Sequence, residues 1–343
     1  MHRADTLTNE QLAGQSLMVG FEGPRLDDDL RSMIGQMHVG GLVLFKRNVS
    51  DPHGLAELCG DVQALSLRTG DPPLMISVDQ EGGSVARLGP PFTVFPGNRV
   101  IGKARSQNAA RAFGTTTARE LKHVGITMNL APVLDVIEQE GDCPVMADRV
   151  FGDDPKLAAD MGRVVIEALQ QGGVAATAKH FPGMGRAVAD PHNDVAHIDT
   201  ERHVLESRDL VPFQSAIESG VEVVMLSHMV YDALDPLWPA SLSSVIAKDL
   251  LRETMGFKGV TITDDLDMGA IDRHFDVGTV VRRICDADID IALICRDRAK
   301  METAYEALLA AMGESPERRR RRLLSVQRLL DLKGRYAPQE VVC

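Results

Sequence analysis

The fold of this chain is best inferred from the stretch Lys179-His180-Phe181-Pro182-Gly183-Met184-Gly185. It follows an apolar run at residues 174–178 that is typical of a buried strand, and it turns at a Pro-Gly pair. Asp190 and His192 follow in the loop beyond the turn. A buried strand that leads into titratable residues on a loop is how barrel enzymes present catalytic groups at one rim.

Eight short apolar runs alternate with longer segments that have apolar residues at helical spacing. The runs cover residues 16–21, 39–45, 74–78, 126–133, 174–178, 221–226, 259–263 and 289–294. They lack strict alternation, as expected of parallel strands buried on both faces. Residues 155–172 and 210–220 are predicted helices that end in glycine. This order predicts a single (β/α)8 TIM-type barrel.

An open doubly wound sheet is the competing fold. It is disfavoured because the turn Gly20-Phe21-Glu22-Gly23 does not match the GxGxxG pattern. We expect one catalytic domain over residues 1–343, with a barrel core at about 12–300 and a C-terminal helical segment at about 301–335. Ser315 is predicted to cap the last helix, and Pro316 to lie in its first turn.

Composition excludes several classes of protein. The net charge of −12 and the aromatic content of 4% argue against a nucleic acid partner, so the arginines at 318–322 are predicted to form a solvated helix face. No run approaches the length of a membrane span, and no apolar signal segment is evident at residues 1–5. We therefore expect a cytoplasmic protein without a membrane partner.

The cysteines predict neither a disulfide framework nor a zinc site. They are odd in number and widely scattered, no CxxC occurs, and core packing is the expected role for most of them. The five are Cys59, Cys143, Cys285, Cys295 and Cys343. No metal-ligand cluster and no nucleophile elbow is present in the sequence, and we expect no metal and no cofactor.

Polar residues accumulate at the C-terminal ends of five of the runs. They are Asp79 to Glu81 with Arg87, Asn129 with Asp135, Lys179 with His180, Ser227 with His228, and Asp264 with Asp265. Polar groups gathered on one rim are costly to the fold unless they serve a ligand. Carboxylates accept hydrogen bonds from hydroxyl pairs, whereas Lys and Arg donate to hydroxyl or acyl oxygens. The pattern predicts a polyhydroxylated substrate.

Four motifs together resemble glycoside hydrolase family 3, and specifically its single-domain β-N-acetylglucosaminidase branch. They are Val78-Asp79-Gln80-Glu81-Gly82-Gly83 with Arg87, Arg149-Val150-Phe151-Gly152, Lys179-His180-Phe181-Pro182-Gly183 with Asp190 and His192, and Thr263-Asp264-Asp265-Leu266. The resemblance runs from about residue 12 to Cys295. It implies a TIM-type barrel without the second, sandwich domain of many relatives, for which we expect this length to leave no room.

The resemblance implies a retaining mechanism with Asp264 as the nucleophile. Adjacent residues of an extended strand point to opposite faces, and alternation alone does not tell whether Asp264 or Asp265 faces inward. The family pattern selects Asp264. It also makes His192 the general acid and base, paired with Asp190, whose charge fixes the imidazole tautomer and raises the pKa of His192.

By the same resemblance, a group of residues holds the sugar beside the nucleophile. They are Asp79, Arg87, Arg149, Lys179 and His180. Any of them alone could instead form a salt bridge at the barrel mouth, above all Arg149, which lies near Asp153 and Asp154 in the sequence.

Three positions depart from the family pattern. Met184 stands where His is common, Pro191 replaces Ser between the dyad residues, and Ser84 replaces Arg. None of them removes a reacting group, so they leave the reaction type in place and the preferred aglycone open.

The expected activity is removal of terminal, non-reducing β-linked N-acetylglucosamine from muropeptide or chitooligosaccharide fragments, with a small carbohydrate as the binding partner. Three alternatives stay open: a β-glycoside phosphorylase of the same family, a β-glucosidase, and a barrel that binds sugar without catalysis.

Overall fold

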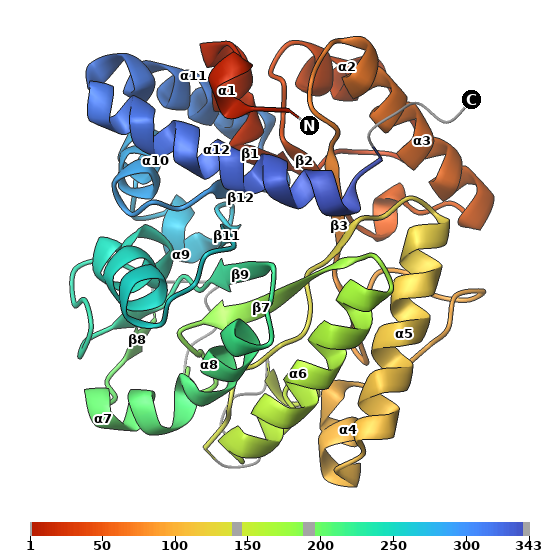
Figure 1. Cartoon of the computed structure of the whole chain (residues 1–343), viewed down its shortest axis with the longest axis vertical. Coiled ribbons are helices and arrows are strands. Elements are labelled where there is room, and N and C mark those ends of the chain that lie inside the picture. The colour runs from red at the N-terminus through yellow and green to blue at the C-terminus, as the bar shows by residue number, and fades with distance from the viewer. Residues whose placement is uncertain (1, 139–145, 188–195, 339–343) are drawn as a thin grey trace.

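The computed structural model describes residues 2–138, 146–187 and 196–338. Eight of the described strands pair in parallel and close into a barrel in the order β1-β12-β11-β9-β7-β6-β3-β2 (Figure 1). They are β1 (Leu17–Val19), β2 (Gly41–Leu44), β3 (Met75–Val78), β6 (Met128–Asn129), β7 (Ala175–Phe181), β9 (Val223–Leu226), β11 (Val260–Asp265) and β12 (Ile291–Ile294). Each strand falls on one of the eight predicted runs. The TIM-type barrel is confirmed, and the open sheet is excluded because β1 pairs with β12.

Helices surround the strands (Figure 1). The α-helices are α1 (Asn9–Gln15), α2 (Asp28–Gly35), α3 (Pro52–Arg68), α4 (Asn98–Ala104), α5 (Gln107–His123), α6 (Pro155–Gln171), α7 (Arg202–Val204), α8 (Val211–Glu218), α9 (Gly269–Asp272), α10 (Val277–Asp286), α11 (Arg298–Glu314) and α12 (Pro316–Tyr336). The described residues also form the π-helices η4 (Leu205–Asp209) and η6 (Val245–Thr254) and the 3-10 turns η1 (Ala4–Thr6), η2 (Lys46–Asn48) and η5 (Ala240–Leu242). The helices predicted at 155–172 and 210–220 are α6 and α8.

Two small ladders lie in loops that follow barrel strands. The loop after β3 contains the antiparallel pair β4 (Gln80–Gly82) and β5 (Val85–Ala86). In the second ladder β8 (His197–Ile198) pairs with β10 (Val230–Tyr231).

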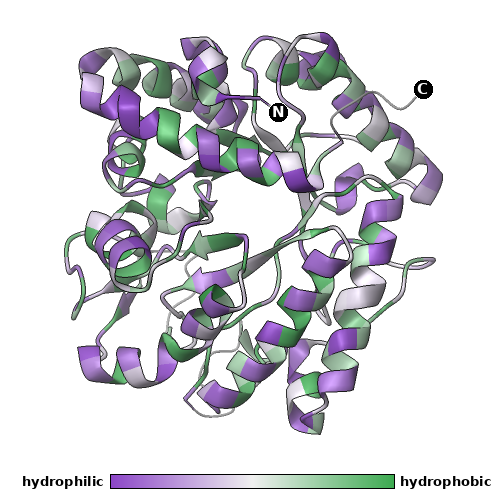
Figure 2. Cartoon of the chain, in the orientation of Figure 1, coloured by the Kyte–Doolittle hydropathy of each residue, from purple (hydrophilic) through white to green (hydrophobic). Residues whose placement is uncertain are grey.

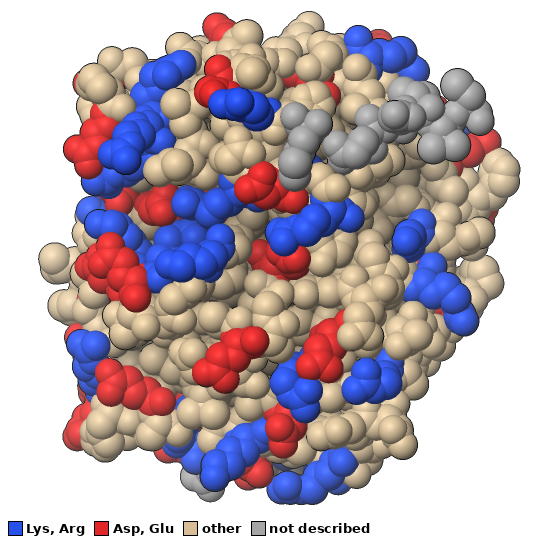
Figure 3. Space-filling view, viewed as in Figure 1, with Lys and Arg blue, Asp and Glu red and all other residues tan. Residues whose placement is uncertain are grey.

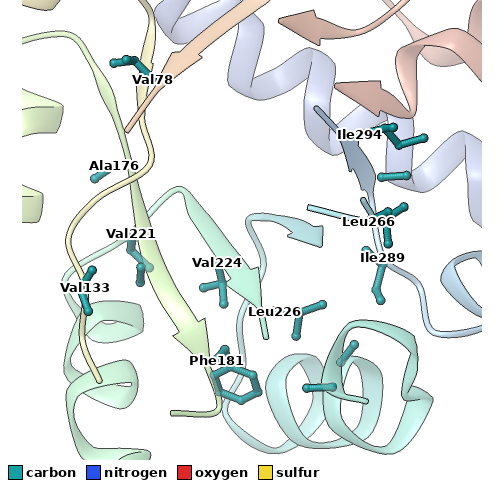
Figure 4. Packing of buried hydrophobic residues seen from close by; sticks show 14 of the residues in the cluster. Val78, Val133, Ala176, Phe181, Val221, Val224, Leu226, Leu266, Ile289 and Ile294 are labelled. Atoms are coloured by element: carbon teal, nitrogen blue, oxygen red, sulfur yellow. The ribbon is translucent and has the colours of Figure 1, made fainter. Parts of the chain in front are cut away.

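The strands carry two apolar layers, one on each face. The outer layer packs against the helices and includes Phe181, Val224 and Leu226 (Figure 4). The Phe181 ring meets the ring of Phe213 on α8 edge-on, with 5.2 Å between the ring centroids. Hydrophobic and hydrophilic residues alternate around the outer helices, as expected for helices that bury one side (Figure 2). The inner layer fills the barrel with residues such as Met225.

Helix α12 closes the barrel at the N-terminal ends of its strands. Leu329 and Leu332 join the inner core. The Ser315 side chain accepts a hydrogen bond from the Arg318 backbone, so the predicted N-cap of α12 is confirmed.

The prediction of a solvated arginine face is wrong for Arg322, whose exposed fraction is only 3%. Its guanidinium donates to the backbone oxygens of Ile289 and Asp290 and to Ser16 Oγ, at the starts of β12 and β1. The turn of α12 that carries Arg322 packs against the barrel, and carbonyl groups at the start of β12 accept its hydrogen bonds.

The other arginines of this run lie outward. Arg319 and Arg320 are exposed, Arg318 pairs with Asp286 and Glu314, and Arg321 pairs with Glu317. Basic and acidic side chains are interspersed over this face of the molecule (Figure 3). The face is therefore mixed in charge, without an extended patch of one sign.

The described cysteines Cys59, Cys285 and Cys295 are buried free thiols, which confirms core packing for these three. Burial raises the pKa of the Cys59 thiol to about 12. Among the described residues, no helix has the length and apolar character that crossing a membrane requires.

Candidate active site

The C-terminal ends of the barrel strands open into a pocket of about 520 Å³. This volume lies within the range typical of small-molecule sites. Six of the predicted site residues line it: Asp79, Arg87, Arg149, Lys179, His180 and Asp264. The other two, Asp190 and His192, lie outside the described residues, as does Pro191. A larger groove of about 1400 Å³ lies at the other end of the barrel, beside Gly125 and Gly173, which precede β6 and β7.

The pocket lies on the same inward-facing row of residues that forms the barrel interior. On β11, Val260 and Ile262 point into the inner core, and the next inward position is Asp264. The same alternation leads to Lys179 on β7 and to Asp79 just after β3. These charged groups are therefore the uppermost layer of a row whose lower layers are mostly apolar core.

Two residues reach the pocket because strand pairing is irregular. The pairing of β11 with β12 shifts between Ile262 and Asp265, and that of β7 with β9 shifts between Ala178 and Phe181. Both Asp264 and Asp265 line the pocket, and so do the adjacent residues Lys179 and His180 on β7. Asp264 and Asp265 therefore both border the pocket at the place where the regular pairing of β11 with β12 ends.

A buried network of charges forms one wall of the pocket. Lys179 Nζ lies 2.8 Å from Asp79 Oδ1 and 2.6 Å from Glu81 Oε1. Arg149 donates to both oxygens of Glu81 at 2.9 Å, and Arg87 donates to Asp79 at 3.1 Å. Burial opposes ionisation, but the cations hold the pKa of Asp79 and of Glu81 below their ordinary values. Burial likewise opposes the charge of Lys179, but these carboxylates raise its pKa.

Glu81 is a site residue that the sequence prediction missed. It stands within the quoted motif, but its role as the partner of both Arg149 and Lys179 depends on contacts with residues 68 and about 100 positions away. The local salt bridge considered for Arg149 does not form with Asp154, whose side chain caps α6 instead.

His180 is held by Asp135, which was also missed. Its Nδ1 lies 2.7 Å from Asp135 Oδ2, and its Nε2 lies 3.4 Å from Arg149 Nη2. Because a guanidinium can only donate, we assign Nε2 as the acceptor and Nδ1 as the protonated nitrogen. The other oxygen of Asp135 accepts from the backbone of Met184 at 2.7 Å. Asp135 thereby ties the end of β7 to the turn beyond it.

Asp264 and Asp265 lie in different electrostatic environments. Burial opposes ionisation of Asp264, but the positive charges that His180 and His228 carry when protonated, together with a hydrogen bond from the Asp265 backbone, hold its pKa below the ordinary value. Burial and the nearby charges of Asp267 and Asp264 raise the pKa of Asp265 to about 6. Asp264 therefore carries the more persistent negative charge of the two.

Asp265 is also tied to the strand framework. Its Oδ1 accepts from the backbone of Asp267 at 3.0 Å and of Cys295 at 3.1 Å. His228 follows the end of β9 and was not among the predicted site residues. Its Nε2 donates to the backbone oxygen of Asp265 at 2.8 Å, and its Nδ1 lies 2.7 Å from Ser241 Oγ. Within the described ranges, no three His, Cys, Asp or Glu side chains are placed to hold a metal ion.

Comparison with known proteins identifies the family. Residues 8–332 match the model described as the glycosyl hydrolase family 3 N-terminal domain. The chain belongs to glycosyl hydrolase family 3. This confirms the resemblance inferred from the four motifs, and this family 3 chain is a glycosidase.

Individual relatives agree with this assignment. The chain is 36% identical, over 94% of its length, to a protein of Xanthomonas axonopodis pv. citri named Beta-hexosaminidase, of which it covers 92%. A family 3 β-N-acetylglucosaminidase from a Paenibacillus species matches with a TM-score of 0.93 and 38% identity over 98% of this chain, which spans only 65% of that protein. A β-N-acetylhexosaminidase from Beutenbergia cavernae matches with a TM-score of 0.89 and 30% identity, over 96% of this chain and 99% of that one.

Replacing Asp265 by Asn tests the environment of this second carboxylate. Its pKa in the folded state is about 6, against an ordinary value of 3.8, so its ionisation destabilises the fold as pH rises through this window. The shift of about two pKa units corresponds to about 3 kcal/mol, and partial exposure reduces the expected gain for Asp265→Asn to about 1–2 kcal/mol. Denaturant unfolding should show this gain at about pH 8 and little of it at about pH 4.

The readout is the pH dependence of the difference between Asp265→Asn and wild type, since the amide can still accept both backbone hydrogen bonds. A difference that is equal at both pH values would contradict the raised pKa.

Proposed function

We propose that this family 3 glycosidase removes terminal, non-reducing β-linked N-acetylglucosamine from muropeptide or chitooligosaccharide fragments. The observation that carries the proposal is an ionised Asp264 at the end of β11, inside a pocket lined by carboxylates and cations suited to a polyhydroxylated substrate. The relatives named as hexosaminidase and N-acetylglucosaminidase support the same sugar. We place this activity in the cytoplasm, in recycling of the murein disaccharide.

In the proposed first step Asp264 attacks the anomeric carbon, and the glycosidic bond to the leaving oxygen breaks. His192, paired with Asp190, gives its proton to that oxygen. The product is a covalent glycosyl ester of Asp264. In the second step the now neutral His192 takes a proton from water, the water oxygen attacks the anomeric carbon, and Asp264 is released as a carboxylate.

The buried network positions the sugar for this attack. We assign Asp79 to accept from sugar hydroxyls, and Arg87, Arg149, Lys179 and His180 to complete the subsite beside Asp264. Because these charges are already paired with one another, the sugar meets groups with fixed positions, and little reorganisation is needed at the moment of reaction.

Phosphorolysis is the second candidate reaction. A histidine acid/base adds no negative charge that would repel phosphate, whereas a glutamate would. Turnover in phosphate and in a non-nucleophilic buffer separates the two reactions, since only phosphorolysis yields a glycosyl phosphate. A barrel that binds sugar without catalysis is disfavoured because the chain has both Asp264 and His192, and loss of either would have favoured such a barrel.

Asp264→Asn should keep the fold and sugar binding but lower turnover by about four orders of magnitude or more, because the amide cannot form a glycosyl ester. A 2-fluoro glycosyl donor, which traps the covalent intermediate, should label Asp264 of the wild type, detected by peptide mass spectrometry. Asp265→Asn is the matched control and should retain turnover. Labelling of Asp265, with Asp264→Asn still active, would refute the assignment of the nucleophile.

The dyad can be tested through the leaving group. His192→Ala should lower kcat/KM for substrates with poor leaving groups by about 10²–10⁴-fold, because they need the proton. For activated aryl glycosides, the loss of kcat/KM in His192→Ala should be far smaller, because their leaving groups depart without a proton. Asp190→Ala should act in the same direction more weakly and move the basic limb of the pH–rate profile to lower pH, because the imidazole loses the charge that raises its pKa.

The control for the dyad is His197→Ala, since His197 is an exposed histidine on β8 that pairs with Asp232. It should leave both classes of substrate unaffected. Equal losses of kcat/KM across all leaving groups in His192→Ala would indicate a structural role instead.

Specificity for the 2-acetamido group is the test of the proposed sugar. With a carboxylate nucleophile the acetamide is not needed for chemistry, so it serves recognition, and analogues without it leave its partners in the site unpaired. N-acetylglucosaminides should exceed glucosides by at least about a hundredfold in kcat/KM, or about 2.7 kcal/mol. A panel of p-nitrophenyl glycosides measures this ratio. Faster cleavage of glucosides would favour the β-glucosidase alternative while leaving the mechanism in place.

A further inference from the structure

One cation of the pocket is unlike the others. Arg296 follows the end of β12, lines the pocket and is exposed. Arg87, Arg149 and Lys179 each pair with a carboxylate of the buried network. In the part of the chain that the structure describes, the Arg296 guanidinium has no hydrogen bond, ion pair or ring contact. It is therefore a positive charge at the pocket mouth that the protein itself does not neutralise.

The backbone of Arg296 is firmly anchored, although its side chain is not. Asp267 Oδ2 accepts from the backbone N–H groups of Cys295 at 3.1 Å, Arg296 at 2.7 Å and Asp297 at 3.2 Å. Lys300 Nζ lies 2.8 Å from Asp267 Oδ1. The carboxylate of Asp267 is thus occupied by a cation and three backbone donors. The backbone N–H groups at this strand end already donate to Asp267. The Arg296 guanidinium is therefore the donor here that can bind a ligand.

The position of Arg296 determines which part of a substrate it can meet. In the proposed complex, the paired network at the pocket wall surrounds the sugar beside Asp264. A side chain at the pocket mouth then contacts the aglycone, the group to which that sugar is linked. Guanidinium binds carboxylate in a planar, two-point arrangement better than it binds neutral hydroxyls. On a chain with a net charge of −12, an isolated positive charge at the mouth also attracts an anionic substrate locally.

We infer that Arg296 forms a subsite for a carboxylate carried by the aglycone. The subsite makes anionic N-acetylglucosaminides, such as those linked to a lactyl-substituted amino sugar, better substrates than neutral chitooligosaccharides. This inference rests on the proposed function and adds to it a residue that selects the aglycone.

The experiment uses two substrates that differ in one charge: N-acetylglucosaminyl-β-1,4-N-acetylmuramic acid with its free lactyl carboxylate, and the same disaccharide with that carboxylate converted to the methyl amide. Wild type should prefer the acid by about three- to tenfold in kcat/KM, the range expected of an exposed but two-point ion pair. Added salt should reduce this preference. In Arg296→Gln the ratio should fall to about one, and Arg296→Glu should invert it.

Arg319→Gln is the matched control, because Arg319 is exposed on α12 at the closed end of the barrel. It should keep the wild-type ratio. Equal cleavage of both disaccharides by wild type, or an unchanged ratio in Arg296→Gln, would overturn the carboxylate subsite while leaving the proposed function intact. Failure of wild type to cleave either disaccharide would overturn the proposed function, and this inference with it.

Inorganic phosphate is the other anion that the same chemistry could bind. Glycosyl phosphate formation by wild type that is lost in Arg296→Gln, with the carboxylate preference unchanged, would assign the residue to phosphorolysis and overturn the inference.

Discussion

The contact between Lys179 and the carboxylates of Asp79 and Glu81 is the interaction on which the pocket depends. It joins the end of β7 to the loop after β3, and Arg149 extends it across the opening. With the Glu81 side chain 1% exposed and that of Lys179 3% exposed, each charge depends on the others. Loss of one partner from such a buried pair costs about 3–5 kcal/mol, because an uncompensated charge stays behind. The wall of the pocket is therefore organised before any sugar arrives.

The barrel explains why reactive groups can occupy this place at all. Its inward row changes from apolar residues such as Ile262 to a carboxylate, Asp264, only in the last layer, where the strand ends. Below that layer the interior is packed with buried apolar side chains, and above it the pocket opens. The same strand thus supplies the rigidity and the proposed nucleophile, and a second carboxylate, Asp265, lines the same pocket where the pairing beside it is irregular. Their different surroundings hold one ionised and raise the pKa of the other.

Local pattern predicted the strands and the rim well, because buried parallel strands require continuous apolar runs and their ends carry polar residues. It did not predict which residues, distant in the sequence, contact one another in the pocket. Asp135 binds His180 from 45 positions away, and no local signal identifies such a pair. The burial of Arg322 was missed for a related reason. The run of arginines looks uniform in sequence, and only the packing of α12 against the barrel separates Arg322 from the exposed Arg319 and Arg320.

The way α12 closes the barrel has a consequence for how the protein is made. β1 pairs with β12, the Arg322 side chain binds Ser16, and Leu329 joins the inner core, so the first strand meets these partners only after β12 and α12 have been made. Before α12 has been made, no helix covers the apolar interior at the N-terminal ends of the strands. Before β12 has been made, the edge of β1 that pairs with β12 is unpaired. Until α12 has been made, the nascent chain therefore carries an incomplete barrel, and its exposed apolar surface is open to aggregation during that interval.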